Sequence, residues 1–297
     1  MEGIERVDLA SRSRTKPVDW PKEGRFFSDY REAVAESDAD LVYISVPNSL
    51  HDELIRAALA AGRHVVVDKP ATLTLEMARD CVDEASRKSL LLAEATVFSY
   101  HPQFDEMRSF IAEYGPLTHI ESALIIPPMP LDNFRNHSHF GGGCLNDMGP
   151  YAAAVARMFG VGHLQKLAVV SAPATSDMDV DLGFSLLASF SSGLRYSGHF
   201  SFESEYQNRL RLVGKSGSLE VDRIFSTPPN YEPVWQVRER NEPSQRHLPA
   251  ADTFGNFMQA VLAAIAEGNY KRFADDLIAD AVFRSRLAAV LEGKNFT

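Results

Sequence analysis

The sequence is poor in cysteine, and its two cysteines suggest neither a disulfide framework nor a metal site. Cys81 and Cys144 are the only two among 297 residues. They stand far apart and form none of the short spacings with which cysteines hold zinc. His137 and His139 are close together, but no acidic or cysteine partner has a fitting spacing, so we expect no bound metal. Two lone thiols are typical of a reducing compartment.

Basic charge and long apolar runs are scarce as well. There are 30 Lys and Arg against 40 Asp and Glu, for a net charge of −10. Such a surface repels phosphate backbones, and no run of Lys and Arg forms a local basic patch, so we expect no nucleic-acid partner. The apolar stretches fall well short of the ~20 residues that span a bilayer, and the N-terminus lacks the apolar segment of a signal peptide. These absences predict a soluble, cytoplasmic protein without a membrane partner.

The hydrophobic content, by contrast, is ample. It amounts to 45% of 297 residues, which is enough for two domains with separate cores. Over residues 1–98, apolar runs alternate with helical spacing, and apolar runs this continuous indicate a parallel sheet covered by helices on both faces. We predict a Rossmann-type domain of right-handed βαβ units there. Its strands are expected at 7–10, 41–46, 64–67 and 90–93, and its helices at 29–36, 50–61 and 75–88.

Residues 99–297 are patterned differently. Several apolar segments follow one another with short turns such as Ser191-Ser192-Gly193 and Lys215-Ser216-Gly217 between them, which is typical of an antiparallel sheet. The predicted fold class is therefore α/β followed by α+β. Strands are expected at 119–126, 164–171, 182–190, 194–202, 209–213 and 218–221, and helices at 102–114, 147–159, 253–267 and 274–291.

Five short motifs occur in order along the chain: Pro47-Asn48-Ser49-Leu50-His51, Gly62-Arg63-His64-Val65-Val66-Val67-Asp68-Lys69-Pro70, Glu94-Ala95, His101-Pro102 and the run from Gly141 to Tyr151. Together they resemble the Gfo/Idh/MocA family of oxidoreductases. That family includes glucose-fructose oxidoreductase, dihydrodiol dehydrogenase and nucleotide-sugar ketoreductases. Each motif alone is common, whereas the ordered set is specific and covers nearly the whole chain. The resemblance implies an NAD(P)-dependent enzyme that interconverts a carbonyl and a secondary alcohol on a sugar or nucleotide sugar.

Lys69 corresponds to the lysine of the family's Glu-Lys-Pro motif, with Asp68 in place of the glutamate. In the family this lysine sits between cofactor and substrate, so the resemblance implies a catalytic and substrate-binding role. An ammonium there can hydrogen-bond a substrate oxygen and lower the pKa of a nearby acid. From the residues alone, an ordinary surface lysine before a proline turn is the alternative.

Asp147 and Tyr151 are four residues apart, which places both side chains on one face of a helix. They match the tyrosine version of the family's Asp-x-Gly-x-His/Tyr motif, found in the dihydrodiol dehydrogenase and sugar-ketoreductase branches. The resemblance implies that both are catalytic and bind substrate, with Tyr151 moving the proton beside Lys69. The pKa of a phenol, near 10, must fall for this, and a neighbouring cation lowers it. The alternatives are a helix N-cap for Asp147 and a half-buried aromatic for Tyr151.

A glycine run precedes this helix. Gly141 to Gly143 follow no buried parallel strand, so they do not form a phosphate-binding loop. We expect a flexible turn that lets Asp147 and Tyr151 approach the substrate. Related sugar enzymes carry an arginine in the preceding loop, so the resemblance implies that Arg135 contacts substrate hydroxyls or a phosphate.

A dinucleotide-binding fold opens with a strand, a G-x-G-x-x-G loop and a helix, and the 297 residues contain no such loop. The strand at 7–10 resembles the family's second strand. The first strand, the glycine-rich loop and the first helix are therefore expected to be missing, about 25 to 30 residues. Either the start was assigned at an internal Met, or the gene is truncated and its product does not bind cofactor as its relatives do. Unpaired edges in a parallel sheet favour the first explanation.

The end of that strand carries Ser11-Arg12-Ser13-Arg14. An acidic residue there would bind the ribose 2′-OH of NAD, whereas an arginine accommodates the 2′-phosphate of NADP. We therefore expect NADP, with NAD as the second choice. The full set of expected cofactor-binding residues is Ser11, Arg12, Pro47, Asn48, His51, Asp68 and Lys69.

Two other functions stay open at this point: a degenerate, non-enzymatic relative that binds a sugar-like ligand or a partner subunit, and a dihydrodiol-type dehydrogenase. By analogy with the family, the sheet of the second domain is expected to pair with another copy in a homo-oligomer.

Overall fold

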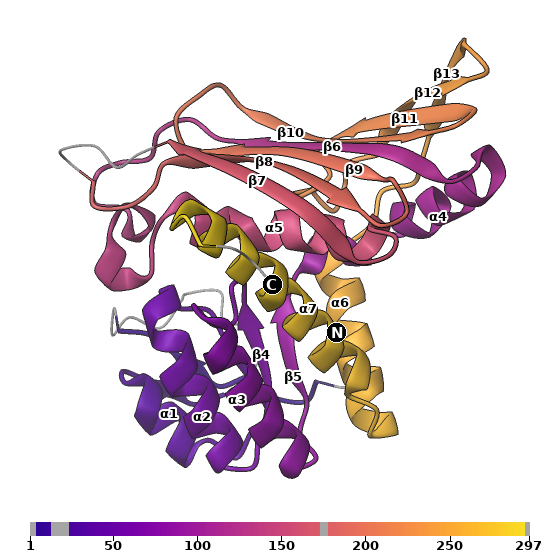
Figure 1. Ribbon diagram of the computed structural model, residues 1–297. Helices are drawn as coiled ribbons and strands as arrows, with labels where there is room; N and C mark the ends of the chain where they lie inside the picture. Colours follow the sequence, from indigo (N-terminus) through magenta and orange to yellow (C-terminus); the bar gives the residue numbers. More distant parts are fainter. Residues whose placement is uncertain (1–3, 13–23, 173–177, 295–297) are drawn as a thin grey trace. The chain divides into compact units, whose positions relative to one another are not determined.

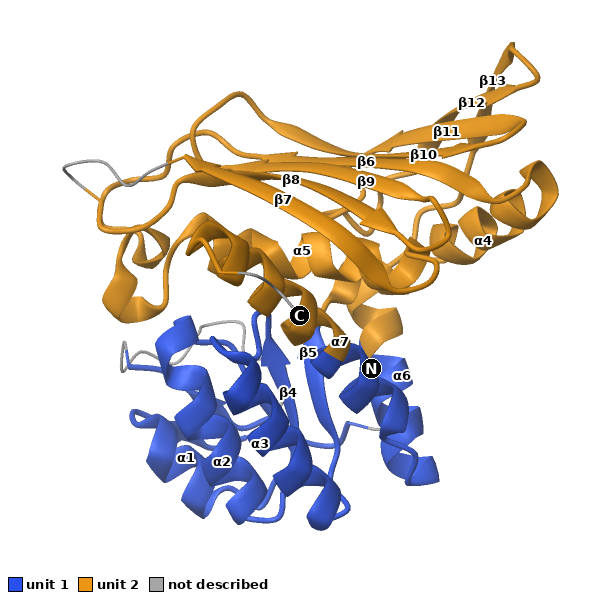
Figure 2. Ribbon diagram, viewed as in Figure 1, with its two compact units in different colours: residues 1–95, 258–278 blue, residues 96–257, 279–297 orange. Residues whose placement is uncertain are grey.

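The computed structural model describes residues 4–12, 24–172 and 178–294. The chain divides into two compact units, which Figure 2 shows in different colours. Unit 1 comprises residues 1–95 and 258–278, and unit 2 comprises residues 96–257 and 279–297. The last two helices of the chain are α6 (Thr253–Glu267) and α7 (Lys271–Leu291).

Unit 1 contains a parallel sheet with helices packed side by side against it (Figure 1). The central strand β4 has three valines, Val65 to Val67, without exposed surface, as expected of a strand covered on both faces. The predicted Rossmann-type architecture is thus confirmed. In sheet order the strands are β3 (Leu41–Ile44), β4 (His64–Asp68) and β5 (Leu92–Ala95), and the helices are α1 (Tyr30–Glu36), α2 (His51–Ala60) and α3 (Leu75–Arg87).

Local signals account for where these elements begin. The Asp29 side chain accepts hydrogen bonds from the first-turn amides of α1, and the Thr74 hydroxyl accepts one from the first turn of α3. A 3₁₀ turn over Asn48–Leu50 leads into α2. A separate pair of parallel strands, β1 (Leu9–Ala10) and β2 (Phe26–Phe27), precedes α1. Strand β2 was not predicted because two residues are too few to show a period.

Unit 2 is built on a sheet of eight strands with helices α4 (Gln103–Tyr114) and α5 (Cys144–Phe159). Helix α5 lies along one face, against β6, β8 and β9 (Figure 1). Its small residues Ala152, Ala153 and Ala154 are fully buried, so the helix can approach the strands closely. The strands are β6 (Leu117–Ile125), β7 (Leu164–Ala172), β8 (Gly183–Phe190), β9 (Arg195–Ser201), β10 (Gln207–Gly214), β11 (Gly217–Asp222), β12 (Val234–Glu239) and β13 (Glu242–His247).

The order of the strands is β13-β12-β11-β10-β6-β9-β8-β7. Neighbours are antiparallel, as predicted, except that β6 and β9 run parallel, so the sheet is mixed. Only strands joined by a hairpin must be antiparallel, and α5, β7 and β8 separate β6 from β9 along the chain. Strands β12 and β13 were not predicted, and β13 is polar and almost wholly exposed, so it has no apolar alternation.

Across the described ranges, none of the helices combines the length and the apolar composition that crossing a bilayer requires.

Candidate functional site

In unit 1 the expected cofactor residues gather where the parallel strands end. Pro47 and Asn48 follow β3, and Lys69 follows β4, so they share the carboxyl edge of the sheet, where α/β proteins bind ligands. Asn48 is 5% exposed, and Lys69 is half-buried. His51 has no exposed surface, and its ring nitrogens lie 2.8 Å from the Pro70 carbonyl oxygen and 2.9 Å from that of Val46. The His51 ring therefore lies between two backbone carbonyls and donates its N–H to one of them.

Asp68, the acid before Lys69, accepts hydrogen bonds from two hydroxyl groups on and just after the neighbouring strand β3. Its carboxylate accepts hydrogen bonds from the Tyr43 hydroxyl at 2.6 Å and from the Ser45 hydroxyl at 2.7 Å. Burial raises the pKa of Tyr43, and the hydrogen bond to Asp68 and its charge raise it further, so the phenol stays a neutral donor. Neither hydroxyl stood out in the sequence, because both are recognised only once β3 pairs with β4.

Ser11 and Arg12 follow β1. The Arg12 side chain is exposed, and its guanidinium carbon lies 5.7 Å from the centre of the Tyr30 ring. An exposed guanidinium at the end of a strand has the chemistry to take a ribose 2′-phosphate, so Arg12 fits NADP. Ser13 and Arg14 lie outside the described residues. No G-x-G-x-x-G occurs in the sequence, so no residue here is assigned to the diphosphate.

In unit 2 the central feature is an ion pair between a half-buried arginine and a buried aspartate. The Arg135 Nε lies 3.0 Å from an Asp147 carboxylate oxygen, and Asp147 is 6% exposed. Pairing with a guanidinium offsets part of the cost of burying a carboxylate. Arg135 lies on a 3₁₀ turn over Phe134–Asn136, and its guanidinium stacks 4.5 Å from the centre of the Phe134 ring. The sequence marked both charges as substrate-binding candidates but did not show that they contact each other.

Helix α5 begins at Cys144, one turn before the predicted start at Asp147, so Asp147 is inside the helix and is not its N-cap. A distant residue makes this possible. The Asp181 backbone carbonyl accepts from the Cys144 N–H at 2.9 Å, and its carboxylate accepts from the Leu145 N–H at 2.8 Å. Burial raises the pKa of Asp181, and hydrogen bonds from backbone amides offset part of that rise.

The glycine run forms a tight turn in close contact with a second backbone segment. A Cβ on Gly142 would lie 2.4 Å from the Arg135 carbonyl oxygen and 2.7 Å from that of His137. The N–H groups of Gly142 and Gly143 donate to these same oxygens of His137 and Arg135, at 3.1 and 2.8 Å. Glycine is needed here because two backbone segments touch. This contact fixes the Arg135 turn against the start of α5.

Tyr151 lies four residues after Asp147 on α5 and is half-buried in an aromatic cluster. The centres of the Phe98 and Phe225 rings lie 5.6 and 5.2 Å from that of Tyr151. Arg135, Asp147 and Tyr151 thus all lie in unit 2, while Lys69 and the other expected cofactor residues belong to unit 1.

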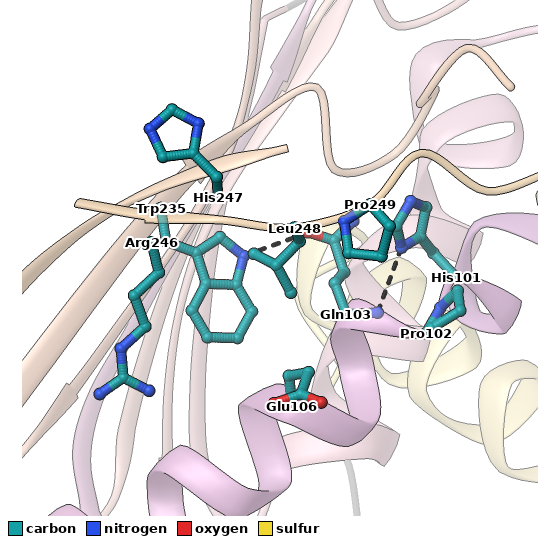
Figure 3. Close-up of a pocket in the computed structure, with 9 residues that line it drawn as sticks. All are labelled: His101, Pro102, Gln103, Glu106, Trp235, Arg246, His247, Leu248 and Pro249. Carbon is teal, nitrogen blue, oxygen red and sulfur yellow. Dashed lines mark hydrogen bonds between the residues drawn. The ribbon is translucent and has the colours of Figure 1, made fainter. Parts of the chain in front are cut away.

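A separate cavity of about 260 Å³ in unit 2 contains none of these residues. Figure 3 shows how Gln103 ties its wall together: its side-chain oxygen accepts from the Trp235 indole N–H at 3.3 Å, and its backbone N–H donates to His101 Nδ1 at 3.1 Å. Burial lowers the pKa of His101, which suits a neutral ring with an accepting Nδ1. The His101-Pro102 motif therefore shapes the start of α4.

Two family models match successive parts of the chain. Residues 10–96 match the model of the oxidoreductase family with an NAD-binding Rossmann fold, and residues 104–220 match the GFO/IDH/MocA C-terminal domain. The dTDP-3,4-didehydro-2,6-dideoxy-alpha-D-glucose 3-reductase of Actinomadura kijaniata is 31% identical over 90% of this chain and 79% of its own length. The enzyme of that name from Saccharopolyspora spinosa is 32% identical, over 80% of this chain and 72% of its own.

A solved structure is similar over almost the whole chain. It is the crystal structure of KijD10, a 3-ketoreductase from Actinomadura kijaniata, in complex with NADP and TDP-benzene. The TM-score is 0.90 at 30% identity, and the match covers 98% of this chain and 90% of KijD10.

Proposed function

Because this chain belongs to the GFO/IDH/MocA family of NAD(P)-dependent oxidoreductases, we propose that it interconverts a carbonyl and a secondary alcohol on a sugar carried by a nucleotide. The observation that supports this most directly is the ion pair of Arg135 with Asp147, a buried carboxylate on the helix that carries Tyr151. A guanidinium and a carboxylate held together offer donors and acceptors to hydroxyl groups, and the guanidinium can also meet a phosphate. The relatives that reduce dTDP-linked keto sugars support the nucleotide sugar as substrate class.

In the direction of reduction, each residue has a separate task. NADPH, when bound, supplies the hydride that reaches the carbonyl carbon. Tyr151 gives its hydroxyl proton to the carbonyl oxygen, which becomes the alcohol, and the Lys69 ammonium hydrogen-bonds that oxygen. Asp147 and Arg135 orient the sugar. Lys69 belongs to unit 1 and Tyr151 to unit 2, so variants of each residue and of both together test their joint action.

Replacing Tyr151 by Phe tests the proton donor. Only a hydroxyl is removed, so folding should survive, and we expect kcat to fall by about 10²- to 10⁴-fold with little change in cofactor affinity. Lys69→Ala should have a similar effect, and the double variant should lose less than the product of the two losses, because the residues act as a unit. The assay is reduction of a panel of nucleotide-linked keto sugars followed by NADPH absorbance.

Tyr196→Phe is the matched control. Tyr196 is fully buried in the same unit and its hydroxyl lies 2.8 Å from the Ser122 hydroxyl, so this change should cost stability and leave kcat alone. If Tyr151→Phe keeps more than about a tenth of the wild-type rate, Tyr151 is not the proton donor and Lys69 becomes the leading candidate.

The cofactor proposal is NADP, with Arg12 at its 2′-phosphate. Because the 297 residues contain no G-x-G-x-x-G, we expect them to bind NADPH weakly in calorimetry. The same chain preceded by a Rossmann-type strand, G-x-G-x-x-G loop and helix, here called the extended chain, should bind it tightly and serve for all activity assays. Micromolar binding by the 297 residues alone would show that the loop is not needed.

We also propose that the open face of the sheet in unit 2 pairs with a second copy of the chain. Val170 on β7 is 71% exposed and Leu187 on the adjacent strand β8 is 57% exposed. Large apolar side chains exposed together on a sheet face are typical of a surface that is covered in an assembly.

A further inference from the structure

Lys69 lies in a turn whose backbone is held by side chains from two other elements. The carbonyl oxygen of Pro70 lies 2.8 Å from a ring nitrogen of His51, the first residue of α2. The N–H of Ala71 donates to a carboxylate oxygen of Glu94 on β5 at 2.7 Å. Both side chains are buried, with His51 at 0% and Glu94 at 7% exposed. The backbone is therefore fixed at the two residues that follow Lys69.

Glu94 is the less expected of the two. One oxygen of its carboxylate meets the Ala71 N–H, and the other is buried without a hydrogen-bond partner within the described part of the chain. A buried carboxylate that is only half satisfied weakens a fold, and an apolar residue on a strand covered on both faces would serve stability better. The Glu94-Ala95 motif was noted in the sequence, but the function proposed above gives it no task.

We propose that Glu94 is a positioning residue for Lys69: by accepting the Ala71 N–H it fixes the turn that aims the lysine side chain. His51 holds the same turn at Pro70, and Asp68, on the other side of Lys69, is held by Tyr43 and Ser45. A lysine has a long, flexible side chain, so its reach is defined only if its own backbone does not move. The effect of Glu94 on catalysis rests on the role proposed above for Lys69. The fixed backbone of the turn does not depend on that role.

The first test needs no cofactor and uses the 297-residue chain. The rate at which acetic anhydride modifies each lysine is measured by mass spectrometry. In Glu94→Ala the turn is released, so Lys69 should be modified several-fold faster, while Lys88, whose ammonium donates to the Leu59 carbonyl at 2.9 Å in the same unit, should not change. Glu94→Gln keeps an acceptor for the Ala71 N–H and should behave like the wild type.

His64→Ala is the matched control. The His64 ring accepts a hydrogen bond from the Leu91 N–H at 2.9 Å, so this variant, like Glu94→Ala, loses a side-chain acceptor for a backbone amide. His64 is the first residue of β4, whereas Lys69 follows the last, so the loss occurs at the other end of the strand. It should lower the melting temperature without changing the modification of Lys69. Equal changes at Lys69 in His64→Ala and Glu94→Ala would overturn the proposal. If Glu94→Ala does not fold, hydrogen exchange of the Ala71 amide in the wild type is measured instead. Slow exchange would support the proposal that Glu94 fixes the turn, and fast exchange would overturn it.

The second test measures turnover in the extended chain. Glu94→Ala should lower kcat by about 10²-fold and leave KM for the sugar nearly unchanged, because the lysine is misplaced and the sugar contacts in unit 2 are not touched. Glu94→Gln should restore kcat, and a Gln variant as slow as the Ala variant would overturn the proposal. If Lys69→Ala keeps full activity, the catalytic role proposed for Lys69 is wrong. The modification rates of Lys69 still test whether Glu94 fixes the turn.

Discussion

The contact between the glycine run and the Arg135 turn leads to a sharp prediction for Gly142→Ala. The added Cβ would lie 2.4 and 2.7 Å from two backbone oxygens, those of Arg135 and His137, and neither can rotate away as a side chain would. The two segments must separate, which breaks the bonds from Gly142 and Gly143 to these oxygens, now 3.1 and 2.8 Å long. Overpacking costs about 1–3 kcal/mol, and each lost hydrogen bond costs about 1 kcal/mol.

The free energy of unfolding should therefore fall by about 3–5 kcal/mol, measured by urea denaturation with circular dichroism. Gly193→Ala is the matched control: Gly193 has a φ of +86°, but a Cβ there meets nothing within 4 Å. Backbone strain alone should cost about 1–2 kcal/mol at that position. Gly142→Ala should also lower kcat in the extended chain, because Arg135 moves away from Asp147. Losses no larger than those of Gly193→Ala would refute the close contact.

Three further predictions concern cofactor choice, pH and assembly. In the extended chain, Arg12→Ala should weaken the binding of NADPH by about 1.5–3 kcal/mol more than the binding of NADH, measured by calorimetry. Equal losses for the two cofactors would show that Arg12 does not contact the 2′-phosphate. Burial raises the pKa of Asp181 above its ordinary 3.8, so the folded protein binds a proton at this carboxyl more tightly than the unfolded chain does. Protonation of Asp181 therefore stabilises the fold at low pH, and this stabilisation is lost as pH rises through the pKa of the folded state. Asp181→Asn, which can still accept from Leu145, should gain stability over the wild type as pH rises through that window in urea titrations, and a constant difference would contradict this. Leu187→Glu should convert the proposed homo-oligomer to monomer in sedimentation without unfolding it, and an unchanged mass would show that this face is not the interface.

Much of the fold could be predicted because the signals are local. The valines of β4, the caps at Asp29 and Thr74 and the small residues of α5 belong to their own elements, and the helices and most of the strands appear where periodicity indicated. The candidate site was visible for a similar reason. Lys69-Pro70 and Asp147 with Tyr151 are contiguous or one helical turn apart, so their spacing survives in any fold that forms these elements.

What could not be predicted depends on residues far apart in the chain. Asp181 caps a helix that begins 37 residues earlier, at Cys144, and this contact starts α5 one turn before the sequence suggested. The crowding at Gly142 was not predicted either, because the carbonyl oxygens that surround it belong to another segment.

By itself, the sequence determined the alternation of strands and helices, the likeness to an oxidoreductase family and the identity of the charged candidates. Only the tertiary structure decided that Arg135 pairs with Asp147, that Glu94 holds the turn after Lys69, and that β6 and β9 run parallel. The physical reason is that apolar periodicity and capping act within a few residues, whereas ion pairs, buried acceptors and strand neighbours form only when packing closes long loops.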